Sequence, residues 1–197
     1  MAVGCGDKDR AQARREQVLA AAEACFQRHG FHSASMAEIS RAAGMSVGHI
    51  YHYFASKEAI IAAIVAREKQ RVLAVDAEVR SHADWGEGIV EQVPRAVARI
   101  EAGQGDALLL EVLAEAARNP GVAALVQQAD EEVRRELRVT LGGASGRGAA
   151  LPDLEGRMEV LCALFDGLHI RAVRHPGLDC AATARVMQRV MRALLEP

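Results

Sequence analysis

The sequence has 197 residues, of which 50% are hydrophobic, 25% are charged and 4% are aromatic, and its formal net charge is −2. This length allows one domain with a sizeable core, or a small domain joined to a larger one. The near-neutral charge excludes a chain that binds nucleic acid by bulk basicity, although a local patch can still bind phosphates. Abundant Ala, Leu, Val, Arg and Glu, with only five prolines, favour helices throughout, so we expect an all-α fold.

The charges are spread almost evenly along the chain. Residues 1–58 carry seven Lys/Arg, six Asp/Glu and four of the seven His, whereas residues 59–197 carry 17 Lys/Arg and 20 Asp/Glu. The N-terminal part is therefore only marginally more basic than the rest.

The cysteine spacing and the lengths of the apolar segments indicate in which cellular compartment the protein is expected. Cys5, Cys25, Cys162 and Cys180 have no CxxC spacing, which favours free thiols in a reducing environment. No signal-peptide pattern opens the chain, and no stretch reaches the roughly 18 apolar residues of a membrane span. We expect a soluble, cytoplasmic protein.

Two helices are predicted at the start of the chain. Helical periodicity over residues 8–29 predicts the first, and Gly30 supplies its C-terminal stop. Ser35 stands three residues before Glu38, which is the spacing of a capping box, and predicts a second helix over residues 36–43.

Serine caps predict the next two helices as well. Ser46 is placed to cap a short third helix that reaches Tyr53, and Ser56 is placed to cap a fourth from Lys57 toward Arg80. Three successive caps predict short helices set at angles to one another.

The rest of the chain is predicted to form longer helices separated by breaks that contain Gly or Pro. A Gly-rich loop is expected over residues 141–153, with Asp153 as the N-cap of the helix that follows. About nine helices are expected in all, and the later ones cover residues 87–102, 106–118, 121–141, 154–174 and 179–195.

Residues 36–53 have the pattern of a helix-turn-helix. Ile39 and Ile50 lie where two short helices must pack together, and Gly44 lies where the turn needs a positive φ. The second helix of this motif enters the major groove of DNA, and its exposed side chains reach base edges. The side chains predicted to be exposed are Val47, Gly48, His49 and His52, with Tyr51 beside them.

The segment "GFHSASMAEISRAAGMSVGHIYHYFASKEAII" resembles the DNA-binding domain of the TetR family of bacterial regulators. The resemblance covers roughly residues 10–65, and its run G-x-I-Y-x-Y-F-x-x-K-E is specific. Two later segments, "LLLEVLAEAARNPGVAALV" and "LFDGLHIRAVRHPGLD", are more loosely similar to the ligand domains of one broad group of these regulators.

The resemblance implies two domains and one class of function. Residues 1–58, with a tail at 1–8, are expected to bind DNA, and residues 59–197 to bind an effector and dimerise. The implied protein is a homodimeric transcription regulator, most often a repressor, that binds a palindromic operator and is released by a small molecule. No catalytic site, cofactor or metal is expected.

The resemblance also assigns roles within the DNA-binding domain. Tyr51, Tyr53 and Lys57 are expected to contact phosphates, and the hydroxyls of Ser35 and Ser46 could do likewise. Val47, His49, Gly48 and His52 are expected to meet the bases. Val47 and His49 differ from the Lys and Thr that are commoner at these positions in the family, so the operator sequence stays open.

The last two predicted helices carry apolar stripes that could meet a twofold mate as a four-helix bundle. The alternative is that these residues belong to the core of a single chain. The residues concerned are Leu161, Leu164 and Leu168 on the first helix, and Val186, Met187, Val190, Met191 and Leu194 on the second.

The other face of the helix over residues 154–174 could line a ligand cavity, and the alternative is a filled helical core. Met and aromatic side chains suit an apolar molecule, and buried carboxylates would favour a cation. The candidate lining residues are Trp85, Leu108, Glu111, Val112, Glu115, Met158, Cys162, Phe165, Asp166 and His169.

A metal site, a helical enzyme or carrier, and an architectural protein are the alternatives to a ligand-responsive regulator. A metal site could be sought at His49 and His52, or at Cys25, His29 and His32. Neither group has further metal ligands at a persuasive spacing. A helical enzyme or carrier lacks the paired Glu-x-x-His motifs of carboxylate-bridged metal bundles. An architectural or division protein that binds DNA without an effector is the other alternative.

Overall fold

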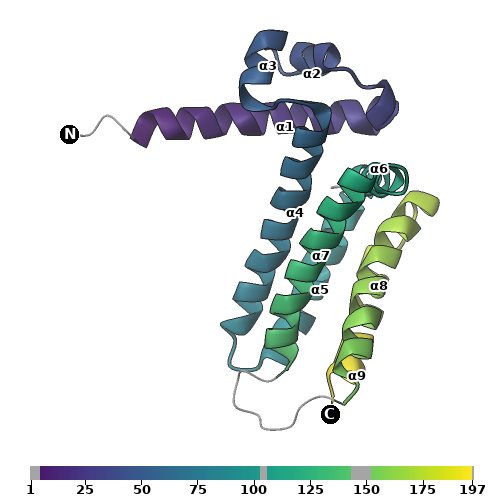
Figure 1. The fold of residues 1–197 in the computed structure, drawn as a ribbon. Helices are drawn as coiled ribbons and strands as arrows, with labels where there is room; N and C mark the ends of the chain where they lie inside the picture. The colour runs from purple at the N-terminus through teal and green to yellow at the C-terminus, as the bar shows by residue number, and fades with distance from the viewer. Residues whose placement is uncertain (1–4, 103–105, 143–151, 197) are drawn as a thin grey trace. The chain divides into compact units, whose positions relative to one another are not determined.

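The computed structural model describes residues 5–102, 106–142 and 152–196, which form nine α-helices and no strand (Figure 1). The all-α prediction is therefore confirmed. Within these ranges no helix is both long enough and apolar enough to span a membrane. The helices are α1 (Cys5–Ser33), α2 (Met36–Ala42), α3 (Val47–Tyr53), α4 (Lys57–Arg80), α5 (Trp85–Glu101), α6 (Asp106–Ala116), α7 (Pro120–Leu141), α8 (Leu154–Arg174) and α9 (Cys180–Leu195).

The chain divides into two compact units. The first unit consists of residues 1–67 and 108–126, and the second of residues 68–107 and 127–197. Helices α4, α6 and α7 each contribute residues to both units. The start of α4 and much of α6 pack with the helix-turn-helix in the first unit, and the boundary between residues 58 and 59 stays a prediction. Part of the predicted tail is also helical, since α1 begins at Cys5.

The serine caps at the starts of α2, α3 and α4 are confirmed. The Ser35 hydroxyl accepts from the Glu38 N–H at 3.2 Å, and the Glu38 carboxylate accepts from the Ser35 N–H at 2.7 Å. The hydroxyls of Ser46 and Ser56 each accept from an N–H three residues further on, both at 3.2 Å. The hydrogen bonds from Ser35 lower the pKa of Glu38. Each cap satisfies a backbone donor that the helix leaves free.

Two glycines have a positive φ, and both interrupt helices at the predicted positions. Gly30 has φ 76° and ψ 159°, so the regular part of α1 ends there, as predicted. Gly44 has φ 64° in the turn between α2 and α3. Other residues rarely adopt these conformations, and the combination at Gly30 is essentially restricted to glycine.

The later helix starts follow the prediction less closely. Asp84 and Asp179 cap α5 and α9, because their carboxylates accept from N–H groups in the first turn. Asp153 stands at the N-cap position of α8 but makes no side-chain capping bond, and its φ is 53°. Asp153 is therefore the N-cap of α8 as predicted, but its side chain does not cap the helix. Most of the predicted loop, residues 143–151, and the break at residues 103–105 lie outside the described residues.

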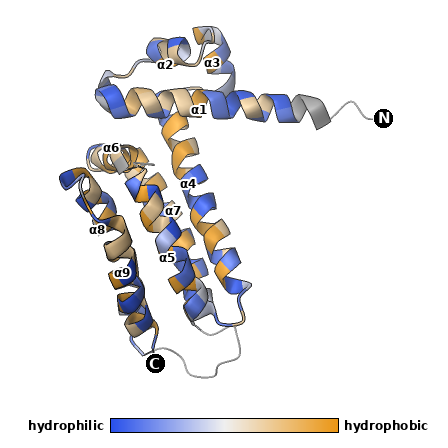
Figure 2. Cartoon of the chain, turned by 180° about the vertical axis from the view of Figure 1, so that it is seen from behind, coloured by the Kyte–Doolittle hydropathy of each residue, from blue (hydrophilic) through white to orange (hydrophobic). Residues whose placement is uncertain are grey.

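The first unit has a core built around α1. Phe26 is 1% exposed and meets the ring of Phe31 edge-on, with centroids 5.3 Å apart, and Phe54 is also buried, so all three are core residues as predicted. Figure 2 shows the apolar residues of α4 concentrated in its N-terminal turns, which belong to this unit. The core also includes Val18, Leu19, Ala22, Ile39, Ile50, Ile60, Ile61 and Ile64.

The second unit has a core between α5, α8 and α9, together with a buried polar contact. Val90, Val93 and Val97 of α5 pack into the same cluster as Met187 and Met191 of α9. Elsewhere in this unit the Thr140 hydroxyl donates to the buried carboxylate of Asp76 at 2.6 Å. Asp76 is also 2.8 Å from the guanidinium of Arg80, so its charge is paired.

Candidate nucleic-acid interface

Helix α3 is held in place by two side chains of α1 that contact backbone carbonyls. Gln17 Nε2 donates to the carbonyl of Ala43 at 2.7 Å, which fixes the end of α2. Arg15 donates to the carbonyl of Tyr53 at 2.9 Å, and its guanidinium lies 4.5 Å from the centre of the Phe54 ring. The turn and the C-terminal end of α3 are thus both fixed from α1. Sequence reasoning missed Arg15 and Gln17, because nothing in the local pattern marks them.

The outer face of α3 is open to solvent. Ile50 is fully buried and anchors the helix, whereas Tyr51 is 51% exposed and Val47 is 39% exposed. Gly48, His49 and His52 are also exposed, as predicted. A large aromatic and a valine on the surface of a small helical domain stabilise no core, which is the pattern of a recognition surface.

Three rings gather on this face. The rings of His49 and His52 each lie 5.2 Å from the ring of Tyr53, and they lie 6.5 Å from each other. Tyr53 is half-buried, and its ring lies between the core and the two histidines that contact it. Both histidines are thereby presented in defined orientations on the outer face.

Gly48 is a helical residue with no packing partner. A Cβ added there would meet no atom within 4 Å, so neither the fold nor a neighbouring side chain requires glycine. Glycine inside a helix is destabilising relative to alanine. Its presence on the outer face is consistent with close approach by a bound molecule.

Two of the residues expected to contact phosphate are engaged within the chain. The Lys57 ammonium donates to the carbonyl of Phe31 at 2.8 Å and to that of His32 at 3.2 Å, and it lies 4.6 Å from the centre of the Phe31 ring. The Ser35 hydroxyl both donates to and accepts from Glu38. Lys57 and Ser35 thus both have partners within the chain, and their contacts with phosphate stay a prediction. Ser46 is exposed, although its hydroxyl also caps α3.

Comparison with known proteins decides the family. The family model described as "Bacterial regulatory proteins, tetR family" matches residues 18–64, and "BetI-type transcriptional repressor, C-terminal" matches residues 106–196. The transcriptional regulator UidR of Escherichia coli K12 is 34% identical over 148 residues, which cover 75% of this chain and 74% of UidR. The chain belongs to the TetR family. It is a ligand-responsive, DNA-binding transcription regulator, and its relatives are regulators rather than enzymes.

Solved structures of TetR-family regulators share the fold. GusR of Salmonella enterica is 31% identical with a TM-score of 0.74, and the match covers 92% of this chain and 96% of that one. FadR of Bacillus subtilis, solved in complex with stearoyl-CoA, is 18% identical with a TM-score of 0.74 over 92% of this chain and 99% of that one. At that lower identity the FadR match supports the fold alone.

The residues predicted to line an effector cavity are divided between the two units. In the second unit Trp85 packs in one cluster with the fully buried Met158, while Cys162 and Phe165 pack against the cluster of α5 and α9. Burial raises the pKa of Asp166 on the same helix, while the nearby His169 lowers it. The first unit holds Leu108, Glu111, Val112 and Glu115.

The two glutamates of α6 have partners in the first unit. Glu111 Oε2 accepts from the backbone N–H of Phe31 at 3.1 Å. Glu115 is 2% exposed, its Oε2 lies 3.0 Å from His32 Nε2, and its Oε1 accepts from Asn119 Nδ2 at 3.2 Å. Both carboxylates thus have partners within the first unit, and their role in effector binding stays a prediction.

The predicted dimer residues separate into core and surface. Leu161, Met187 and Met191 are buried within the protomer, as the alternative of a single-chain core expects, and Met187 also lines a pocket, so a role for these three residues in a dimer stays a prediction. Leu164, Leu168 and Leu194 are half-buried against the same core, and Val190 is exposed. Sequence reasoning missed the exposed apolar residues Val160, Ile170 and Val173, although the spacing of three residues between Ile170 and Val173 is a usable signal.

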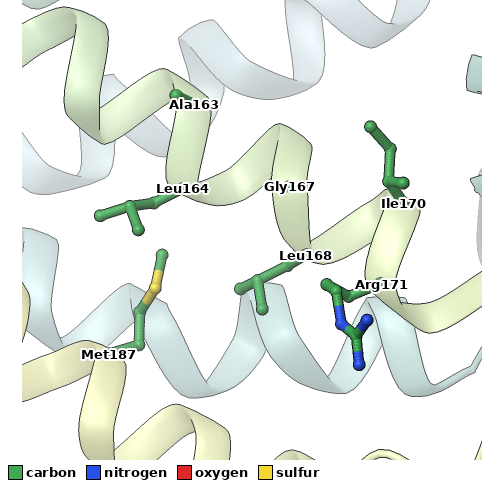
Figure 3. Close-up of a pocket in the computed structure, with 7 residues that line it drawn as sticks. All are labelled: Ala163, Leu164, Gly167, Leu168, Ile170, Arg171 and Met187. Atoms are coloured by element: carbon green, nitrogen blue, oxygen red, sulfur yellow. The ribbon is translucent and has the colours of Figure 1, made fainter. Parts of the chain in front are cut away.

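An apolar pocket of about 410 Å³ lies on the surface formed by α8 and α9 (Figure 3). Leu164, Leu168 and Met187 point toward the same space in Figure 3, and Ile170 and Arg171 lie at one end. Ala163 and Gly167 complete the lining. Small and apolar side chains on adjacent helices form a surface that another helix can approach closely.

Proposed function

We propose that this TetR-family regulator is a homodimeric repressor that binds a palindromic operator and is released from it by a small molecule. The observation that carries the proposal is the outer face of α3, where exposed side chains serve no core and are held by contacts from α1. As a transcription regulator it would act on cytoplasmic DNA.

Within α3 we propose two classes of DNA contact. Tyr51, and in part Tyr53 and Ser46, contact phosphate oxygens through hydroxyl groups and set the register of the protein on DNA. His49 and His52 read purine edges, and Val47 reads a thymine methyl group. The support is exposure, since the side chains of Val47, His49 and His52 all lie on the open face.

The α8–α9 surface is the proposed dimer interface. Exposed Val160, Ile170 and Val173 on α8, and Val186 and Val190 on α9, extend the apolar area around the pocket. An exposed apolar surface of this kind on two adjacent helices is typical of a helical protein–protein interface. Two copies meeting there would present two α3 helices to successive major grooves, about 34–36 Å apart.

The proposed effector is small and largely apolar. It would contact Trp85, Met158, Cys162 and Phe165, with Asp166 and His169 as its polar partners. A cationic effector is less well supported, because Glu111 and Glu115 contact the end of α1. Since α4 contributes residues to both units, its displacement by a ligand would change the spacing of the α3 helices.

DNA readout can be tested with two variants of α3. Tyr51→Phe removes a phosphate contact, so we expect weaker binding to every duplex by about the same factor, roughly five- to tenfold. His49→Ala is expected to change the order of preference among duplexes that differ at single base pairs. The measurement is fluorescence anisotropy with duplexes from the region upstream of the gene, over a range of salt concentrations.

The outcomes separate the functions. A wild-type chain that binds no upstream duplex, or binds without salt dependence, contradicts the repressor proposal. Equal effects of both variants on all duplexes contradict only the division of roles. Binding that no small molecule ever releases favours the architectural alternative.

Effector binding can be followed through the single tryptophan, Trp85. Neutral, cationic and anionic compounds that share one ring system are titrated separately, and we expect the neutral compound to change Trp85 fluorescence and to release the duplex. Phe165→Ala is expected to weaken that response roughly tenfold, through loss of buried apolar contact. A response to the cationic compound alone contradicts the proposed apolar effector.

A further inference from the structure

The end of α1 contains a buried backbone break that needs external hydrogen-bond partners. We call Gly30, Phe31 and His32 the α1 corner. Gly30 leaves the helical conformation, and Phe31 directly after it is 4% exposed. Buried backbone N–H and C=O groups that lack partners cost free energy, so this break must be compensated by other elements.

Two carboxylates of α6 supply acceptors to the α1 corner. Glu111 Oε2 accepts from the Phe31 N–H at 3.1 Å, and the same oxygen lies 3.5 Å from where a Cβ at Gly30 would be. One helical turn further along α6, Glu115 Oε2 pairs with His32 Nε2 at 3.0 Å. The side chain of Asn119 donates to the other Glu115 oxygen at 3.2 Å, which fixes the orientation of this carboxylate.

The first residue of α4 supplies the matching donor. Lys57 Nζ donates to the carbonyls of Phe31 and His32, and its charge lies over the Phe31 ring. The α1 corner therefore has one carboxylate at the Phe31 N–H, a second beside the His32 ring, and the Lys57 ammonium at its carbonyls. These bonds are charge-assisted and directional, so they fix the backbone more tightly than apolar packing would.

The α1 corner leads directly into the helix-turn-helix. Ala34 N–H donates to the Gly30 carbonyl at 3.2 Å, Ala34 is fully buried, and α2 begins two residues later at Met36. Helix α6 matches the C-terminal family model, yet Glu111 and Glu115 lie in the same compact unit as the helix-turn-helix. A buried carboxylate adds little net stability compared with an apolar pair, so its geometric effect is the stronger explanation.

We propose that Glu111 and Glu115 are positioning residues for operator binding, which hold the α1 corner and thereby the orientation of α2 and α3. They act through the backbone of Phe31 and the side chain of His32, and they touch neither DNA nor effector. Because α6 carries them, a displacement of α6 loosens the corner without any change in the DNA-contacting side chains. The inference rests on the proposed DNA-binding function.

The test compares Glu111→Ala with Glu111→Gln. The alanine variant leaves the Phe31 N–H without its acceptor, so we expect about tenfold weaker binding to the upstream duplex, with binding to an unrelated duplex almost unchanged. The glutamine variant keeps an oxygen acceptor and should recover most of the affinity. Amide hydrogen exchange at Phe31 should be faster in the alanine variant and close to wild type in the glutamine variant.

Glu91→Ala is the matched control. Glu91, like Glu115, lies near a histidine, in its case His82 at 3.7 Å, but it is on the surface of the second unit, so its loss should leave duplex binding unchanged. Thermal unfolding of each chain shows whether the DNA-binding unit stays folded at the assay temperature.

Each outcome has one meaning. If wild type binds no upstream duplex, the proposed function fails. If wild type binds and Glu111→Ala matches it in affinity and in Phe31 exchange, the positioning proposal is overturned. Equal losses on both duplexes, or a glutamine variant as weak as alanine, also overturn it, because they indicate general destabilisation and not control of α2 and α3.

Discussion

A chain in which Ile170 and Val190 are both replaced by glutamate is expected to be a folded monomer that has lost most of its operator affinity. Ile170 is 42% exposed on α8 and Val190 is 41% exposed on α9, so glutamate at either site is hydrated in the monomer. In the proposed dimer the same carboxylates would be buried without partners and would repel their symmetry mates. Sedimentation or light scattering gives the mass directly.

The loss of DNA affinity follows from the loss of bivalency. A dimer binds two half-sites of the same duplex at once. Linking two binding modules in this way typically raises the overall affinity about a hundredfold to ten-thousandfold. We expect a loss of that order on a two-half-site duplex and little change on a duplex with one half-site. The two duplexes therefore separate dimerisation from damage to α3.

Val139→Glu is the control for the added charge. Val139 is an exposed apolar residue of the same unit, 46% exposed, but it lies on α7 away from the α8–α9 pocket. This variant should remain dimeric and bind like wild type. A dimeric Ile170→Glu/Val190→Glu chain, or a monomeric Val139→Glu chain, would show that copies associate through a different surface.

Gly48→Ala should change stability and DNA binding in opposite directions. A Cβ at Gly48 meets nothing in the protein, and alanine is the better helix former, so we expect unfolding to cost about 0.5–1 kcal/mol more. On the DNA-facing side of α3 the added methyl group would separate the helix from the bases. We expect operator affinity to fall about tenfold or more, because base contacts contribute roughly 1–3 kcal/mol each.

Gly156→Ala provides the matched comparison. Gly156 is also a helical glycine whose added Cβ would meet nothing within 4 Å, but it lies on α8 in the second unit. Its replacement should raise the melting temperature without any effect on the duplex titration. If both alanine variants bind DNA like wild type, the outer face of α3 near Gly48 is not in contact with DNA.

Local chemistry explains which parts of the fold the sequence could predict. Ser35, Ser46 and Ser56 cap helices through residues three positions away, and Gly30 ends α1 through its own backbone, so each signal is contained in a few adjacent residues. The helix-turn-helix was predictable for the same reason. Its family pattern spans about thirty contiguous residues.

Contacts between distant segments could not be predicted in this way. Lys57 bonds to carbonyls 26 and 25 residues earlier, and Glu111 bonds to an amide 80 residues earlier. From the sequence alone, Lys57 and Glu111 are charged residues of the kind that are usually exposed or bind a ligand. Met191 likewise has the spacing of an interface residue, but packing between α5 and α9 buries it completely.

The contacts that hold α3 use backbone carbonyls, at Ala43 and Tyr53, and the anchoring side chains belong to α1. Every amino acid carries a carbonyl, so exchange of Val47, His49 or His52 leaves both anchors intact. Operator preference can thus diverge between descendants of a duplicated gene without loss of stability. It also makes these three positions the natural choice for a library of regulators with altered targets.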